Sequence, residues 1–271
     1  IRLHDKAYIT HTSIKPIKEV CRYFEENGTA AELQEAYYYM GSVYRDLNDY
    51  PNAVTYFLKS TEVAESNSDI DGALWECTYS QLSYLYNQQF NYSSALDAAI
   101  KGLDIAEKFN TSNERTYINT STAYFESGDT TNATTLCNKA INNILGNGIS
   151  KSNADIVSKA MYHYTITNQY LHAGLCYELL KSLPKNELPR NYIPNVAVYL
   201  ERFVSADSAA ITMSELYETT NRIESKYDAA RWLTRYYVAK GEYEKAADYA
   251  INFINANEAV IDKRNFEHTT N

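Results

Sequence analysis

A chain of 271 residues with 45% hydrophobic content is long enough to bury a core, as two ordinary domains or as one repeat array. Only 9 glycines and 5 prolines occur, which argues against a turn-rich all-β fold and favours long helices. The formal net charge is −9 and no basic cluster is present, so this segment is a poor candidate for binding nucleic acid, whose phosphates need Lys and Arg.

The first predicted element is a helix over residues 13–28, SIKPIKEVCRYFEENG. It has no partner helix before it, so residues 1–33 are predicted to form an N-terminal cap or partial repeat. No apolar run approaches the roughly 20 residues of a membrane span. No signal peptide is visible either, but the chain lacks an initiator Met and could be an excised piece.

A repeated pattern follows. Residues 46–65 align with residues 88–107 at an offset of 42 positions, so that Ala53 falls on Ala95. Similar units recur further along the chain, with spacings of 42, 38, 40, 36 and 37 residues between the alanines at their centres, namely Ala53, Ala95, Ala133, Ala173, Ala209 and Ala246. A unit that recurs at intervals of this length is typical of solenoid proteins.

Each unit is predicted to contain two helices. In the first, Tyr37, Met40, Gly41 and Tyr44 recur at helical spacing, and Asn48-Asp49 provides the turn. The alanine after the turn suits a place where two helices cross closely. The sequence therefore predicts an all-α fold, a right-handed superhelical α-solenoid of about six helix pairs plus an N-terminal half-repeat, with residues 1–271 as a single domain.

This pattern resembles the tetratricopeptide repeat. Its small residue, tyrosine, alanine and aromatic positions are matched in the first unit by Gly41, Tyr44, Ala53 and Phe57. The resemblance covers residues 30–257, although the periods are long and the usual closing proline is missing except at Pro184. Residues 5–13, followed by 35–60, also resemble envelope tetratricopeptide proteins of Bacteroides-type bacteria. Members of that family often begin with a lipoprotein signal, and many continue into a membrane helix and a DNA-binding region.

A solenoid of this kind presents a concave inner face, lined by the first helix of each pair. Repeat geometry places the following side chains there: Tyr38, Ser42 and Arg45; Ser80, Tyr84, Asn87 and Gln88; Arg115, Thr122 and Phe125; Asp155, Ser158, Tyr162 and Thr165; Val198, Glu201 and Arg202; Arg231 and Arg235. Aromatic, amide and guanidinium groups suit a peptide partner. Arg231 and Arg235 lie one helical turn apart and are the best candidates for holding an anionic group.

Catalysis is not expected. The sequence has no nucleophile elbow, phosphate-binding loop or dinucleotide glycine motif. The cysteines Cys21, Cys77, Cys137 and Cys176 are widely spaced and are interpreted as single buried thiols, with a disulfide or zinc site as the alternative. The 5 histidines show no metal-binding spacing, so neither a metal nor a cofactor is predicted.

Three functional interpretations remain open. The leading one is a non-catalytic scaffold that binds protein or peptide in its groove. The second is a ligand- or peptide-sensing domain of a membrane-anchored bacterial regulator, in which the membrane is reached only through an anchor outside this chain. The third is a self-associating structural module. The resemblance implies the bacterial cell envelope as the location, periplasmic or lipid-anchored, with the cytoplasm as the alternative.

Overall fold

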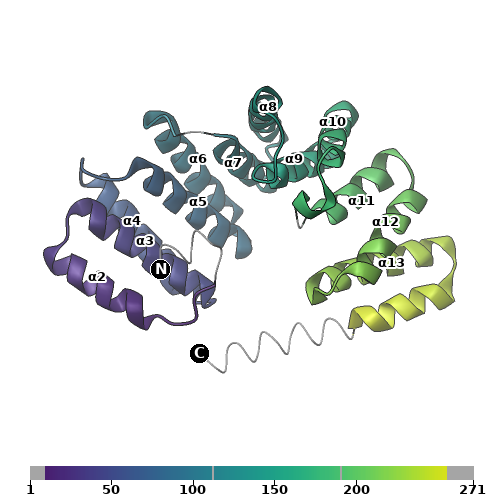
Figure 1. Ribbon diagram of the computed structural model, residues 1–271, viewed down its shortest axis with the longest axis horizontal. Helices are drawn as coiled ribbons and strands as arrows, with labels where there is room; N and C mark the ends of the chain where they lie inside the picture. The colour runs from purple at the N-terminus through teal and green to yellow at the C-terminus, as the bar shows by residue number, and fades with distance from the viewer. Residues whose placement is uncertain (1–9, 112, 190, 255–271) are drawn as a thin grey trace. The chain divides into compact units, whose positions relative to one another are not determined.

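Helices make up all the regular structure that can be described. The computed structural model describes residues 10–111, 113–189 and 191–254, apart from the side chain of Glu224, and none of these residues is in a strand (Figure 1). The predicted all-α class is confirmed. The elements are α2 (Lys15–Asn27), α3 (Ala30–Asp46), α4 (Tyr50–Glu65), α5 (Gly72–Gln88), α6 (Tyr92–Lys108), α7 (Glu114–Glu126), α8 (Thr130–Asn147), α9 (Ala154–Ile166), α10 (Tyr170–Lys181), η1 (Lys185–Glu187), α11 (Tyr192–Phe203), α12 (Ala206–Thr219) and α13 (Ile223–Lys240), and residues 243–254 are also helical.

The chain divides into two compact units, which are described separately below. Unit 1 is Ile1–Asn142 and unit 2 is Asn143–Asn271, so the division falls within α8. Within each unit, consecutive helices pack as antiparallel pairs, α3 with α4 and α5 with α6 in unit 1, α9 with α10 and α11 with α12 in unit 2. The prediction that residues 1–271 form a single domain stays a prediction.

The turn inside most helix pairs is marked by one residue in the left-handed region. It stands five positions before the repeat alanine, and its φ is 60° at Asn48, 58° at Phe90, 91° at Gly128, 62° at Asn168 and 75° at Gly241. Asparagine and glycine adopt this conformation at low cost, whereas phenylalanine does so rarely. In the fifth pair the equivalent residue is Val204, with φ −121°. The sequence pattern of this pair is also the weakest of the six.

Helices cross closely where the sequence offers a small residue. A Cβ atom added to Gly41 in α3 would lie 2.7 Å from Cδ1 of Phe57 in α4. The equivalent contact in the third pair is a hydrogen bond, because the Ser121 hydroxyl donates to the carbonyl oxygen of Ala133 at 2.7 Å. Small residues therefore set the spacing between the two helices of these pairs.

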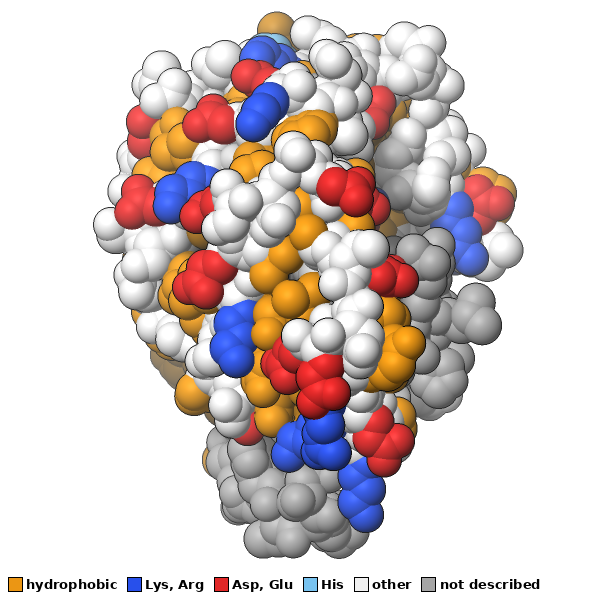
Figure 2. Space-filling model, turned by 90° about the vertical axis from the view of Figure 1, so that its left-hand side faces the viewer, with side chains coloured by type: hydrophobic (Ala, Val, Ile, Leu, Met, Phe, Trp, Pro, Cys, Tyr) orange, Lys and Arg blue, Asp and Glu red, His pale blue; other side chains and the backbone are white. Residues whose placement is uncertain are grey.

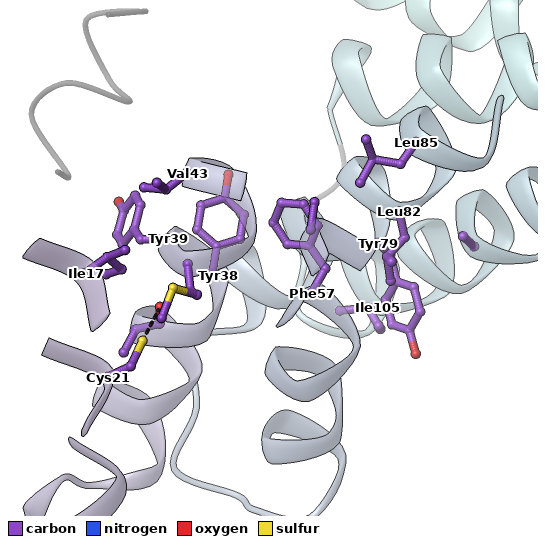
Figure 3. Packing of buried hydrophobic residues seen from close by; sticks show 14 residues of the cluster. Ile17, Cys21, Tyr38, Tyr39, Val43, Phe57, Tyr79, Leu82, Leu85 and Ile105 are labelled. Carbon is purple, nitrogen blue, oxygen red and sulfur yellow. Dashed lines mark hydrogen bonds between the residues drawn. The ribbon is translucent and has the colours of Figure 1, made fainter. Parts of the chain in front are cut away.

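One hydrophobic core runs through the first helices of unit 1 (Figure 3). Ile17 and Cys21 of α2 contribute to the same cluster as Phe57 of α4 and Leu82 of α5. The Cys21 thiol also donates to the carbonyl oxygen of Ala36 at 3.3 Å, the dashed contact in Figure 3. The helix at the start of the chain thus shares the core of the first pair.

Unit 1 also repeats one polar contact from pair to pair. A lysine ammonium lies over the ring of a tyrosine 22 positions earlier, with ammonium-to-centroid distances of 5.4 Å for Lys59 and Tyr37, 5.7 Å for Lys101 and Tyr79, and 5.4 Å for Lys139 and Tyr117. The tyrosine hydroxyls of the first two sets donate to carboxylates of the preceding helix, at 3.0 Å to Glu25 and 2.9 Å to Glu65. These contacts tie each first helix to both of its neighbours.

The outer surface near α2 mixes charges of both signs. Figure 2 shows a band of hydrophobic side chains with acidic and basic side chains interspersed on either side of it. Val20, Tyr23 and Leu58 are among the exposed hydrophobic residues of α2 and α4. In the described residues, no helix has the length and apolarity that a membrane crossing requires.

Candidate inner-face binding site

In unit 1, two of the predicted groove residues lie in the core. Tyr38 and Ser42 are buried, and the Tyr38 ring lies 5.7 Å from that of Phe57 (Figure 3). Among the described residues, the Ser42 hydroxyl oxygen has no hydrogen-bond partner. Their role in a groove stays a prediction, but a partner could reach neither side chain without repacking the first helix pair.

The end of α3 is covered by the segment that precedes α2. Both the backbone N–H and Nδ1 of His11 contact Oδ2 of Asp46, at 3.1 Å and 2.7 Å. His11 is itself buried. This contact joins residues 35 positions apart, so helical periodicity gives no sign of it. The segment before α2 therefore packs against the end of α3. α3 is the helix that was predicted to line the inner face of the first pair.

Arg45, another predicted groove residue, is already engaged. Its guanidinium donates to Oδ1 of Asp46 at 2.8 Å and 3.1 Å, and to Oε1 of Gln81 in α5 at 2.7 Å. Burial of Asp46 works to raise its pKa, but the hydrogen bonds from Arg45 and His11 outweigh burial and hold the pKa below its ordinary value. The guanidinium is thus part of a network that joins α3 to α5.

The other predicted residues of unit 1 are more accessible. On α5, Tyr84 and Gln88 are exposed and Asn87 is half-buried, and on α7 Phe125 is half-buried. They carry aromatic and amide groups, and Arg115 of α7, also predicted to face the groove, is exposed and charged. This part of the inner face can offer stacking and neutral hydrogen bonds beside one guanidinium group.

In unit 2, the predicted residues of α9 and α11 meet at one pocket. Glu201 and Arg202 line a cavity of about 410 Å³ together with Thr165, Ile166 and Val198. Tyr162, one turn before Ile166 on α9, is half-buried. The pocket has an apolar wall and a charged rim. All of its lining residues except Ile166 are among the side chains that repeat geometry placed on the inner face.

A hydrogen bond links α11 to α13 beside this pocket. Nε1 of Trp232 donates to Oε2 of Glu201 at 3.2 Å. The indole also stacks on Tyr236, with ring centroids 5.6 Å apart and planes 14° from parallel. Helical periodicity gives no sign of this contact, and the sequence analysis did not predict it. The signal for it is the indole N–H, which needs a partner when it is partly buried.

Three arginines flank that link. Arg202 follows Glu201 directly, Arg231 precedes Trp232, and Arg235 lies one turn further along α13, all of them exposed. Arg202 and Arg235 form no hydrogen bond or ion pair with any described residue. Burial raises the pKa of Asp228, against the opposing charge of Arg231. Unit 2 therefore presents guanidinium groups that are available to an anion.

The cysteines give this surface no further chemistry. Cys21, Cys137 and Cys176 are buried as predicted, whereas Cys77 is exposed on α5. Burial raises the pKa of Cys21 to about 12 and that of Cys137 to about 11, so these thiols stay protonated. Within the described ranges, no group of three or more His, Cys, Asp or Glu side chains could hold a metal ion.

Comparison with known proteins agrees with the repeat pattern. Residues 32–108 match the family model described as tetratricopeptide repeat. The matched segment runs through the pairs α3–α4 and α5–α6, from the first turn of α3 to the end of α6. No catalytic family is indicated. No curated protein matches the chain.

Solved structures extend the likeness beyond this segment. The apo form of RapI is 12% identical, with a TM-score of 0.69, and the match covers 92% of this chain and 70% of that one. The apo quorum sensor NprR from B. thuringiensis is 13% identical, with a TM-score of 0.65 and coverage of 93% and 71%. The Rap conjugation gene regulator of the plasmid pLS20, in complex with the Phr* peptide, is 15% identical, with a TM-score of 0.61 and coverage of 92% and 69%. At these identities the likeness shows the fold, a helical-repeat solenoid.

Proposed function

We propose that this chain is a non-catalytic scaffold that binds a protein or peptide segment on the inner face of its helical repeats, and that unit 2 holds an anionic group of that partner. The observation that carries the proposal is the set of exposed arginines, Arg202, Arg231 and Arg235, around the Trp232–Glu201 hydrogen bond.

The chemistry of the surface favours a peptide. A guanidinium presents a planar fork of donors that matches a carboxylate. The apolar wall made by Ile166 and Val198 can receive a hydrophobic side chain next to that charge. A peptide with alternating apolar and acidic side chains would contact the apolar wall and the arginines at the same time.

The structural neighbours support this proposal. One was solved in complex with a peptide, Phr*. Its fold is shared by this chain over most of the length of both, which makes a peptide a reasonable occupant here. The partner's identity is not implied, because the two sequences are only 15% identical.

A sensing domain is the second candidate. Two neighbours are described as a conjugation gene regulator and a quorum sensor, and this favours a role in which a bound peptide changes the arrangement of helices. An anchor or output domain outside this chain would be needed, and location in the cell envelope is part of the same proposal. A sensor should change its small-angle scattering profile when peptide binds, whereas a rigid scaffold should not.

The binding proposal is tested by charge reversal. The probe is a fluorescent extended peptide in which leucine and glutamate are spaced by serine, and its match carries lysine in place of glutamate. We expect the chain to bind the glutamate peptide more tightly. The triple variant Arg202→Glu, Arg231→Glu, Arg235→Glu should weaken that binding at least tenfold, since each exposed ion pair is worth up to about 1 kcal/mol.

Arg22, an exposed arginine of α2, provides the matched control. Arg22→Glu makes the same change on another surface and should leave the affinity unchanged. Equal binding of the two peptides, or full affinity in the triple variant, would refute the assignment of the anion to unit 2.

A further inference from the structure

The connection between α10 and α11 differs from the others. It spans residues 182–191, longer than the connections at 66–71, 109–113 and 148–153, and it carries Pro184 and Pro189. A short 3-10 helix, Lys185–Glu187, lies within it. α10 packs on α11 much less closely than α4 packs on α5 within unit 1. The inserted segment therefore separates α10 from α11, and the two helix pairs pack on each other through α9 and α11 instead.

The space that results is a cavity of about 710 Å³ between α10, the connection, α11 and α12. Its floor is formed by side chains that are buried, Val196, Leu200 and Leu216. The connection adds an apolar wall, Leu183, Leu188 and Pro189, opposite Ile193. This volume lies within the range of sites that bind small molecules, and it is too confined for a helix or a second domain.

Polar groups gather among the side chains lining this cavity. Lys181 and Lys185 are exposed, and each faces an exposed carboxylate, Glu178 at 3.3 Å and Glu215 at 3.6 Å. Ion pairs this exposed are weak and exchange readily with another anion. Among the side chains that line the cavity there are two lysines and one carboxylate, Glu215, so a ligand with one negative charge complements the lining.

Hydroxyl groups add neutral donors near the lysines. Tyr177 and Tyr192 both line the cavity. Burial raises the pKa of Tyr192, helped by the nearby Tyr177 and Glu178, so its hydroxyl keeps its proton and can donate to an anion.

We infer that this cavity binds an amphiphile with a hydrocarbon body and a single anionic head group, the body on the Val196–Leu200–Leu216 floor and the head between Lys181 and Lys185. None of the arginines Arg202, Arg231 and Arg235 lines this cavity, so the inference does not depend on the proposed peptide binding.

The test uses the full chain and three probes with the same alkyl chain, titrated by isothermal calorimetry below their micelle concentrations: dodecanoate, dodecanol and dodecyltrimethylammonium. We expect saturable binding of one dodecanoate, weaker binding of dodecanol and the weakest binding of the cation. The double variant Lys181→Glu, Lys185→Glu should weaken dodecanoate about tenfold and leave dodecanol unchanged, because both lysines are exposed and their replacement spares the core.

Two further variants define the outcome. Val196→Phe fills the floor and should weaken both dodecanoate and dodecanol, while Lys245→Glu, an exposed lysine outside the cavity, should change neither. The inference is wrong if dodecanoate does not saturate, if the double variant binds it normally, or if the cation binds as tightly. It is equally wrong if the chain forms dimers that Val196→Phe disrupts, since a second copy would then be the occupant.

Discussion

The two units use similar helix pairs but treat their charged groups differently. In unit 1, Arg45 is held by Asp46 and Gln81, and a lysine lies over a tyrosine ring in three successive pairs. Unit 2 also pairs its lysines, Lys240 with Asp207 and Lys245 with Glu242, but Arg202 and Arg235 have no such partner among the described residues. A charge paired within the fold contributes to stability, whereas an exposed and unpaired one is available to a ligand. Because Arg22 of unit 1 is exposed as well, the difference concerns Arg45 against Arg202 and Arg235, and it supports the proposal that the arginines of unit 2 take part in recognition.

The largest loss of stability is expected from a substitution in the core of unit 1. Phe57 is fully buried between α3 and α5, so Phe57→Ala should lower the free energy of unfolding by about 3–5 kcal/mol. Chemical denaturation measures the loss, and hydrogen exchange should place it in α3 to α5. Leu171→Ala in unit 2, at a side chain 80% exposed, is the control and should change stability by less than about 0.5 kcal/mol. Equal loss of protection in both units would show that they do not act as separate structural parts.

A smaller loss of stability is expected when a side chain is added where α3 and α4 cross. Gly41→Ala places a methyl group 2.7 Å from the Phe57 ring and should cost about 1–3 kcal/mol, although alanine favours a helix. Gly146→Ala, in the last turn of α8 with no atom within 4 Å, should instead be neutral or slightly stabilising. Thermal unfolding of the two variants provides the comparison, and a Gly41→Ala protein as stable as the parent would contradict this account of the crossing.

The network around Asp46 should give unit 1 a dependence on pH. Because its folded pKa is depressed, Asp46 contributes stability that is complete above the unfolded value near 3.8 and is lost as the pH falls through the folded value. Asp46→Asn should cost about 1–2 kcal/mol at neutral pH and less in acid. Denaturation at a series of pH values measures this, and a constant difference between the two proteins across the range would argue against the network.

The smallest expected effect concerns the turns. Phe90 is 78% exposed and adopts φ 58°, where Asn48 and Asn168 stand in other pairs. Phe90→Asn should therefore raise stability by up to about 1 kcal/mol. Val204→Asn, at a residue with φ −121°, should bring no such gain. If both changes act alike, the left-handed turn is not what limits the stability of the second pair.

Much of the fold could be predicted from local pattern. The alanine spacing located the helix pairs, and Asn48 marked the turn of the first pair because asparagine tolerates positive φ. Contacts between distant segments could not be predicted in this way. Nothing in the periodicity places His11 on Asp46. Nor does it show that Tyr38 and Ser42, which were expected in a groove, are buried, with the Tyr38 ring against Phe57.

The candidate site was predicted unevenly for the same reason. Repeat geometry predicted Glu201, Arg202, Arg231 and Arg235 on one face. All four are exposed, and the shared face stays a prediction. The hydrogen bond from Trp232 to Glu201 depends on how α13 packs on α11, and the cavity behind Pro184 depends on an inserted connection. Neither the packing of these helices nor the inserted connection is encoded in the repeat pattern that was used for the prediction.

The chain has 2 tryptophans, Trp75 in unit 1 and Trp232 in unit 2, so two indole N–H signals in a nitrogen-15 correlation spectrum report on the two units separately. Titration with the leucine–glutamate peptide tests the central claim most directly. The account predicts that the Trp232 signal shifts with saturation while the Trp75 signal stays in place, and that the triple arginine variant abolishes the shift. A shift of Trp75 alone, or none at all, would contradict the assignment of recognition to unit 2.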